Sequence, residues 1–149
     1  MTDAPTLPIP AEQLIPHRSP MRLVDALLSC EAGSGTTGAC LGADSIVADE
    51  RGVLDEAALV ELIAQSYAAV KGYDDLLNGK PVGKGFLVGI RKLRITGTAH
   101  AGDRLLTSVT TVAAIEGFSV IEGTVSRGDD EIASGTMKVW LVDTCETGR

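Results

Sequence analysis

The order of apolar and polar residues predicts one buried helix near the middle of the chain. From Ala57 to Val70 the sequence reads A-A-L-V-E-L-I-A-Q-S-Y-A-A-V, and its apolar residues lie on every side of a helical wheel. We expect the helix to fray through Tyr73–Asn78, with Gly79 and Pro81 closing it. Such a helix needs cover over most of its surface.

Most of the remaining chain has the alternating pattern of β-strands that bury one face. In the last of them, Ala133, Met137 and Leu141 share one side, while Ser134 and Lys138 share the other. The predicted strands are Met21–Cys30, Thr36–Leu41, Gly85–Thr96, Arg104–Ala114, Phe118–Arg127 and Glu131–Val142, with tight turns at Glu116–Gly117 and Gly128–Asp130. Residues 1–20 are rich in proline and are predicted to be irregular, apart from one turn of helix at Ala11–Leu14.

These elements predict an α+β architecture in which a curved antiparallel sheet wraps around one long helix. One sheet covers about half of a helix that is apolar all round. A second copy of the protein, or a substrate channel, can cover the rest. We therefore expect the hotdog fold, one domain spanning residues 1–149, and a dimer.

Composition narrows the functional classes. The net charge is −7, no block of Lys or Arg is present and only 3% of residues are aromatic, so the chain does not resemble a nucleic-acid-binding protein. No apolar run reaches the ~20 residues of a membrane span, and the acidic, proline-rich start is unlike a signal peptide. Three cysteines at unrelated spacings, Cys30, Cys40 and Cys145, indicate reduced thiols in the cytoplasm, with neither a disulfide framework nor a metal site.

Glu61 is the one carboxyl inside the apolar helix. A carboxylate in apolar surroundings is costly unless it is paired, hydrogen-bonded or neutralised, so such groups are candidates for functional sites. The alternative is a glutamate on a narrow exposed strip beside Gln65.

Three segments resemble the 3-hydroxyacyl-carrier-protein dehydratases. I-P-H-R-S-P-M-R-L-V-D at Ile15–Asp25 is similar to their opening P-H-R-x-P-(F/M)-L-L-V-D, and V-E-L-I-A-Q-S-Y-A-A at Val60–Ala69 is similar to their central helix E-x-M-A-Q-x-x-A. G-F-L-V-G-I-R-K-L at Gly85–Leu93 resembles the strand G-F-L-x-G-x-R of one branch, the aryl-polyene-type or ApeP-like dehydratases. The three segments occur in the family's order and together span most of the chain.

The chain departs from the common fatty-acid dehydratases at one point. Those enzymes have a catalytic histidine in a G-H-F-P loop some fourteen residues before the helix glutamate. Here that neighbourhood reads D-S-I-V-A-D-E-R-G and contains no histidine. The chain has only His17 and His100, so catalytic competence does not follow from the superfamily as a whole.

The resemblance implies dehydration of a 3-hydroxyacyl thioester, in which a proton leaves C2 and hydroxide leaves C3. His17, in the family's opening block, is the candidate base, because an imidazole titrates near neutral pH. Glu61 is the candidate acid, since burial can raise the pKa of a carboxyl enough for this role. The alternative for His17 is a purely structural hydrogen bond in the N-terminal segment, and we expect His100 to be solvated in a loop.

Three further residues are candidates for supporting roles. Gln65, one turn after Glu61, could orient its carboxyl, or else bond to backbone or a partner helix. Backbone N–H groups around Ala57 could polarise the thioester carbonyl at the helix start. Arg91 could form an ion pair with Asp25 or a helix carboxylate, or guide a phosphopantetheine arm.

The leading hypothesis is therefore a dehydratase-like enzyme acting on an acyl group held on an acyl carrier protein, with no cofactor beyond the carrier's phosphopantetheine. Two alternatives remain: a non-catalytic hotdog subunit that supports an active partner in a heterodimer, and a thioesterase. Carrier proteins are acidic, so a basic patch is needed on this acidic chain. The available charges are Arg18, Arg22, Lys84, Arg91, Lys92 and Arg94.

Overall fold

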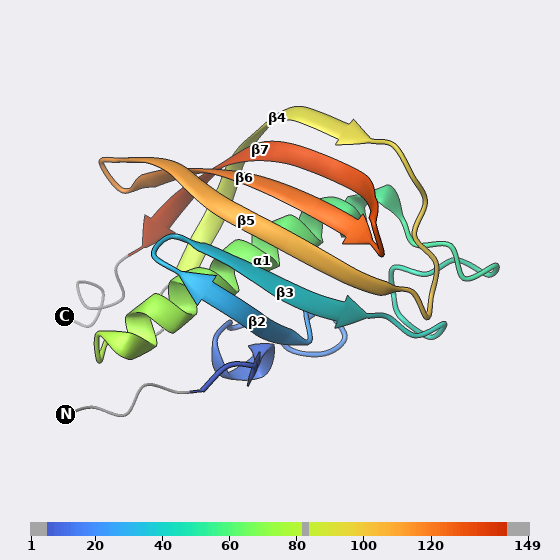
Figure 1. Ribbon diagram of the computed structural model, residues 1–149, viewed down its shortest axis with the longest axis horizontal. Helices are drawn as coiled ribbons and strands as arrows, with labels where there is room; N and C mark the ends of the chain where they lie inside the picture. Colours follow the sequence, from blue (N-terminus) through green and yellow to red (C-terminus); the bar gives the residue numbers. More distant parts are fainter. Residues whose placement is uncertain (1–5, 82–83, 143–149) are drawn as a thin grey trace.

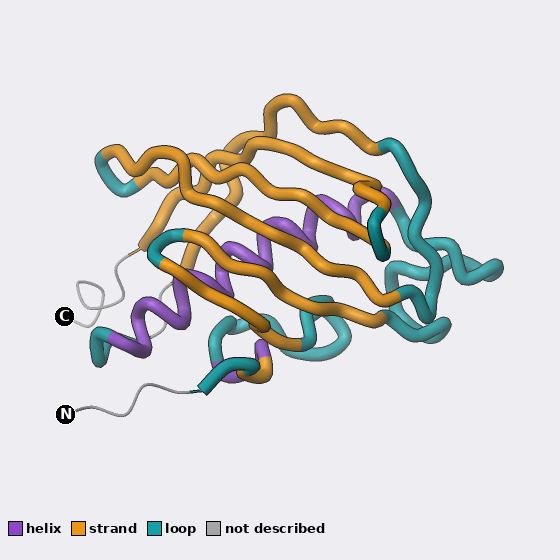
Figure 2. The backbone as a smooth tube through the Cα atoms, in the orientation of Figure 1, coloured by secondary structure: helices purple, strands orange, loops and turns teal. Residues whose placement is uncertain are grey.

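A computed structural model describes residues 6–81 and 84–142 of the protein. Within these ranges it contains a seven-stranded sheet, one α-helix and one short 3-10 helix (Figures 1 and 2). The elements, in chain order, are β1 (Ile9–Pro10), η1 (Ala11–Gln13), β2 (Ala26–Glu31), β3 (Ser34–Cys40), α1 (Glu56–Leu77), β4 (Lys84–Ile95), β5 (Arg104–Ile115), β6 (Phe118–Arg127) and β7 (Asp130–Val142).

The sheet is antiparallel throughout and has the strand order β1-β2-β3-β5-β6-β7-β4. It curves around α1, which lies along its concave side (Figure 1). The chain leaves the end of α1 and enters β4, which pairs with β7 on one side only and so forms an edge of the sheet. The predicted arrangement of a curved sheet around one long helix is confirmed.

The core lies between α1 and the concave sheet face. The alternation predicted for β7 is present, since Ala133, Met137 and Val139 are buried. On β6, a Cβ at Gly123 would collide with Ile63, so the glycine lets the helix lie close to the sheet. The largest buried side chains of this core include Leu59, Leu62 and Ile63 from α1 and Leu105, Val109, Ile121, Ile132 and Met137 from the sheet.

Helix α1 has well-defined ends. Asp55 caps its start, where Oδ1 accepts a hydrogen bond of 2.8 Å from the backbone N–H of Ala57. The helix remains regular to Leu77, so the predicted fraying through Tyr73–Asn78 is wrong. Asp75 is buried on the last turns and forms an ion pair with Lys71, one turn earlier, which explains the order of this end.

The predicted strand Met21–Cys30 is wrong over its first half, because β2 begins only at Ala26. Asp25 bonds to Gly38 of β3, but Met21, Leu23 and Val24 before it bond to a side chain. The buried amide of Gln65 accepts from the N–H groups of Leu23 and Val24 and donates to the carbonyl of Met21. The other predicted strands lie within two residues of the observed bounds, and the predicted helical turn near Ala11 is η1.

The structure also bears on the cysteines and on the predicted absence of a membrane span. Cys30 and Cys40 are free thiols, whereas Cys145 lies outside the described residues. Across residues 6–81 and 84–142, no helix combines the length and hydropathy required to cross a membrane.

Candidate functional site

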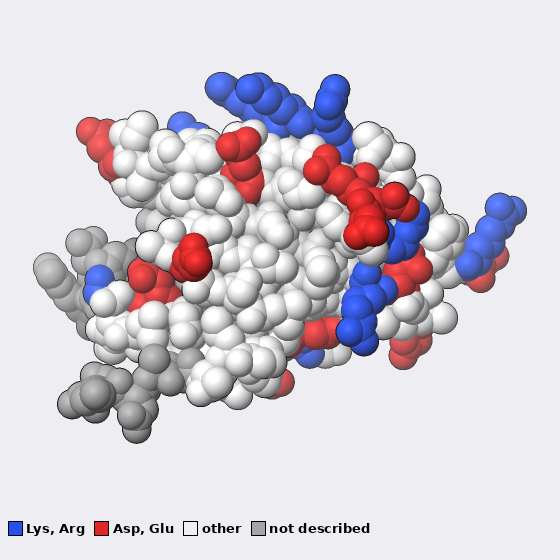
Figure 3. All heavy atoms as spheres, viewed as in Figure 1, with Lys and Arg blue, Asp and Glu red and all other residues white. Residues whose placement is uncertain are grey.

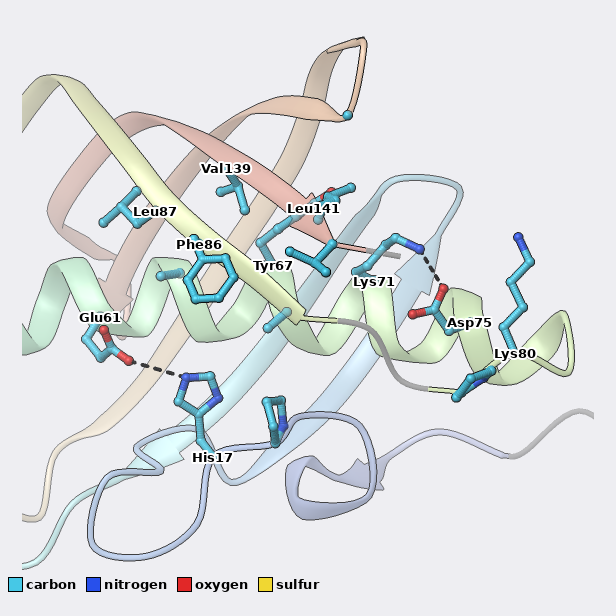
Figure 4. A pocket seen from close by; sticks show the side chains of 17 residues that line it. His17, Glu61, Tyr67, Lys71, Asp75, Lys80, Phe86, Leu87, Val139 and Leu141 are labelled. Carbon is cyan, nitrogen blue, oxygen red and sulfur yellow. Dashed lines mark hydrogen bonds and ion pairs between the residues drawn. The ribbon is translucent and has the colours of Figure 1, made fainter. Parts of the chain in front are cut away.

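A cavity of about 570 Å³ lies beside α1, between the helix, the segment that precedes β2 and the strands β4 and β7 (Figure 4). Tyr67 of α1 lines it, and so do five other helix residues that recur every three or four positions: Glu61, Ala64, Ala68, Lys71 and Asp75. Their spacing of three and four residues places them on one face of α1. Between Ala58 and Gly72, Val60 is the one half-exposed helix residue that lies off this stripe. The channel that we considered as cover therefore lies along the incompletely buried face of this part of the helix.

His17 and Glu61 face each other at one end of the cavity (Figure 4). His17 Nε2 lies 3.9 Å from Glu61 Oε2, and the two side chains are 34% and 45% exposed. The glutamate is therefore only half-buried in this single chain, less than its apolar sequence context predicts. An imidazole and a carboxyl at this spacing could act on adjacent atoms of one bound molecule.

Gln65 holds Glu61 in place from the buried side. Its Oε1 accepts from two backbone N–H groups, Leu23 at 2.8 Å and Val24 at 3.3 Å. This fixes the orientation of the amide, so Nε2 must point the other way. Nε2 donates to Glu61 Oε2 at 2.7 Å and to the carbonyl of Met21 at 2.9 Å. The i,i+4 contact proposed from the sequence is present, together with the backbone bonds that were its alternative.

The backbone around His17 is held by its neighbour. Arg18 Nη1 donates to the carbonyls of Ile15 and His17, each at 2.8 Å. His17 Nδ1 is buried and has no hydrogen-bond partner among the described residues. In many sites a hydrogen bond to the second ring nitrogen fixes which nitrogen carries the proton. The described residues provide no such bond to His17 Nδ1.

The middle of the cavity is apolar. Phe86 and Leu87 of β4 and Val139 and Leu141 of β7 face the helix across it (Figure 4). Tyr67 also lines it, and its hydroxyl donates to Ser119 Oγ at 3.0 Å. Tyr67 is buried, as expected for a core residue, but it borders the cavity as well.

The far end of the cavity is charged, which our sequence analysis missed. Lys71 Nζ lies 2.5 Å from Asp75 Oδ1. Burial lowers the pKa of Lys71, but its hydrogen bond to Asp75 and the negative charge of that carboxylate outweigh this effect and raise the pKa above the usual value. The signal was in the sequence, because Lys71 and Asp75 are one turn apart and share a helix face with Glu61.

Two predicted site residues are not at the cavity. Ala57 is exposed at the start of α1, where its N–H is already bonded to Asp55, so it is not free to polarise a thioester. Arg91 is exposed on β4 beside Thr136 and does not line the cavity. None of the ion pairs within the described residues involves Arg91.

Asp25, one partner considered for Arg91, has a structural role. Its Oδ2 accepts from the N–H of Cys40 at 2.8 Å, and its Oδ1 lies 3.7 Å from Arg22. His100 is exposed next to Asp103, as expected for a loop residue. The described residues contain no cluster of three or more His, Cys, Asp or Glu side chains that could bind a metal ion.

Solved structures share this architecture. A chain of the dehydratase heterocomplex ApeI:P from Xenorhabdus doucetiae superposes with a TM-score of 0.85 at 19% identity, covering 93% of this chain and 95% of that one. Conserved protein PA5202 from Pseudomonas aeruginosa gives 0.66 at 18% identity, with coverages of 88% and 98%. A hypothetical thioesterase with coenzyme A from Streptococcus pneumoniae TIGR4 gives 0.64 at 11% identity, with coverages of 78% and 87%. Identities this low show the fold alone, and that fold is the predicted hotdog.

Sequence comparison gives the family. No curated protein matches the chain. The model of the ApeP-like family, described as ApeP dehydratase, matches residues 9–147. Since this match covers nearly the whole chain and includes both the His17 segment and the cavity face of α1, the protein belongs to the ApeP-like dehydratase family.

Proposed function

We propose that this protein removes water from a 3-hydroxyacyl thioester carried on the phosphopantetheine of an acyl carrier protein. The observation that supports this most is the His17–Glu61 pair, which faces an elongated cavity with apolar walls. A hydro-lyase of this kind needs one base, one acid and a space for the acyl chain. Here a histidine, a glutamate and an apolar space lie together, and the dehydratase family of the chain supports this assignment.

In the proposed reaction, His17 Nε2 accepts the proton from C2 of the substrate. The electron pair of the C2–H bond forms the C2=C3 double bond, and the C3–O bond breaks. Glu61, protonated at the start, gives its proton to the departing hydroxyl, which leaves as water. Gln65 donates to Glu61 Oε2, which leaves Oε1 as the oxygen that carries the acidic proton.

We further propose a second hotdog chain as a partner along β4. This edge strand has no neighbour on its outer side in the described chain, and Val88, Ile90 and Leu93 are 52%, 39% and 41% exposed. A row of free backbone groups with apolar side chains favours pairing with another strand. The similar structure from Xenorhabdus doucetiae is a heterocomplex, so the partner could be a second copy or a different hotdog chain.

The same strand has the basic side chains that an acidic carrier protein would require. Arg91, Lys92 and Arg94 follow one another on β4 and are exposed. Figure 3 shows Lys and Arg side chains gathered along this upper edge, while the broad sheet face below it carries few charges. We propose this patch as the carrier contact and, from the family's description, aryl-polyene or fatty-acid-like biosynthesis in the cytoplasm as the pathway.

Two observations favour a second candidate function, that of a non-catalytic subunit whose partner holds the active site. Glu61 is 45% exposed, and the G-H-F-P loop histidine is missing. A thioesterase, in which a carboxylate activates water, would use the same cavity, and hotdog neighbours of that description exist.

The decisive experiment measures dehydration of a carrier-bound 3-hydroxyacyl substrate by the purified protein, alone and with a co-expressed hotdog partner. We expect His17→Ala and Glu61→Gln each to lower the rate by about 100-fold or more. His100→Ala and Glu56→Gln are the matched controls and should retain activity, because both residues are exposed and neither lines the cavity.

The alternatives give different results in the same assay. A Glu61→Gln chain that still supports full activity of the partner would replace the enzyme assignment by that of a non-catalytic subunit. Release of free acid and thiol without any enoyl product would identify a thioesterase.

A further inference from the structure

The cavity has a charged end that the proposed dehydration does not use. The helix face along it runs from Glu61 through two alanines, Ala64 and Ala68, to Lys71 and Asp75 (Figure 4). The small alanine side chains leave room for a ligand above the helix. Beyond this apolar stretch, a bound molecule would meet the ion pair formed by Lys71 and Asp75.

The two ends are separated by the length of an extended acyl group. Lys71 is ten residues after Glu61 on a regular helix, which separates their Cα positions by about 15 Å. A thioester placed between His17 and Glu61 would therefore direct its acyl chain along the alanines, with the far end at Lys71.

The charges of the pair decide which chemical group fits there. The Asp75 side chain is only 4% exposed, and that of Lys71 is 33% exposed. Lys80 also lines this end of the cavity, but an anion such as a phosphate that reached the Lys71 ammonium would be repelled by the buried carboxylate beside it. A terminal methyl group would displace water from the ammonium and give no hydrogen bond in return. A neutral hydroxyl can accept from the ammonium and is compatible with the carboxylate.

We propose that Lys71, held by Asp75, is a specificity-determining residue that recognises a neutral hydroxyl or carbonyl group at the distal end of the acyl chain. The inference rests on the proposed function for the position of the thioester. An ammonium has three N–H donors, and the bond to Asp75 uses one of them. Asp75 positions Lys71 from the next helical turn, and the substrate contact itself is made by Lys71.

The test uses two 3-hydroxyacyl-pantetheine thioesters of equal length, one ending in a hydroxyl group and the other in a methyl group. We expect the protein to prefer the hydroxyl-terminated compound in kcat/KM by about tenfold or more, as for a hydrogen bond to a charged group. Lys71→Met should bring this ratio close to one, whereas Lys71→Arg should retain part of it. Lys138→Met, on the outer side of β7, is the control and should leave the ratio unchanged.

Binding of the same two compounds to the Glu61→Gln variant, measured by calorimetry, separates this inference from the proposed function. No dehydration by the parent protein, together with a Lys71-dependent binding preference in the Glu61→Gln variant, would contradict the dehydratase and support the recognition site. An unchanged ratio in Lys71→Met would overturn the recognition site, as would an equal loss for both compounds. A Lys71→Met effect seen only when pantetheine is replaced by phosphopantetheine would overturn it too, because it would assign Lys71 to the phosphate.

Discussion

The amide of Gln65 connects the carboxyl of Glu61 to the backbone of the segment that contains His17. Its Nε2 donates to Glu61 Oε2 at 2.7 Å, and its Oε1 accepts from the N–H of Leu23 at 2.8 Å. The two candidate catalytic side chains come from separate parts of the chain, and Gln65 bonds to both parts. Gln65 itself is fully buried.

Replacing Gln65 by leucine should therefore cost stability as well as activity. Leucine has a similar volume but leaves the N–H groups of Leu23 and Val24 and the carbonyl of Met21 without partners. At about 1–3 kcal/mol for each unsatisfied buried group, with partial relaxation, we expect a loss of about 3 kcal/mol in the free energy of unfolding. Urea denaturation measures it.

Gln13 provides the matched control, because it is exposed at the end of η1. Gln13→Leu should change the free energy of unfolding by no more than about 0.5 kcal/mol. Equal stability of the Gln65→Leu and Gln13→Leu variants would show that the buried amide does not hold the segment.

Much of the fold follows from local pattern. The strands from β4 to β7 were predicted within two residues because their alternation and turn signals are local properties of the sequence. Met21–Asp25 was assigned to a strand because its apolar residues look the same whether they pair with a strand or with a side chain. The bond from Gln65 that decides this spans 42 residues, and local pattern does not contain it.

The sequence motifs identified part of the candidate site. His17, Glu61 and Gln65 were identified from the family motifs, and the structure brings them together. Ala57 and Arg91 are not at the cavity. The Asp55 cap that occupies the Ala57 N–H is a local feature, only two residues away, that the sequence analysis missed. The direction of an edge-strand side chain such as Arg91 depends on tertiary geometry and could not be read from its motif.

Gly72 is a second test of close packing. Alanine is favoured over glycine in a helix by about 1 kcal/mol, yet a Cβ at Gly72 would collide with the backbone carbonyl of Leu14. We expect Gly72→Ala to destabilise the protein by about 1–3 kcal/mol, measured by thermal or urea unfolding. Gly89→Ala is the control, since a Cβ there meets no atom within 4 Å. A Gly72→Ala variant more stable than the parent would contradict the packing of η1 and its neighbours on α1.

The open edge of β4 predicts association. Light scattering at micromolar concentration should give a mass well above the 15.5 kDa of one chain, for the protein alone or with its co-expressed partner. Val88→Lys should lower this mass, because it places a charge among the exposed apolar residues of the edge. Ile115→Lys is the control, as Ile115 is 63% exposed at the end of β5, away from this edge. A mass of one chain under all conditions would contradict the interface.

The ion pair of Lys71 and Asp75 predicts how stability depends on alkaline pH. Burial acts to lower the pKa of Lys71, but the hydrogen bond and charge of Asp75 outweigh it, and the pKa in the folded protein is raised above 10.5. A raised pKa means that the folded state holds the proton more tightly than the unfolded state does. The contribution of Lys71 to stability is therefore complete below pH 10.5 and is lost as the pH rises through the pKa of the folded state.

The free energies of unfolding of the parent and of Lys71→Met, measured in urea, should thus differ most at neutral pH and converge above pH 10.5. Lys138→Met, which removes the same charge from β7, is the control. A difference between Lys71→Met and the parent that stays constant from pH 8 to pH 12 would show that Lys71 and Asp75 do not form an ion pair in solution.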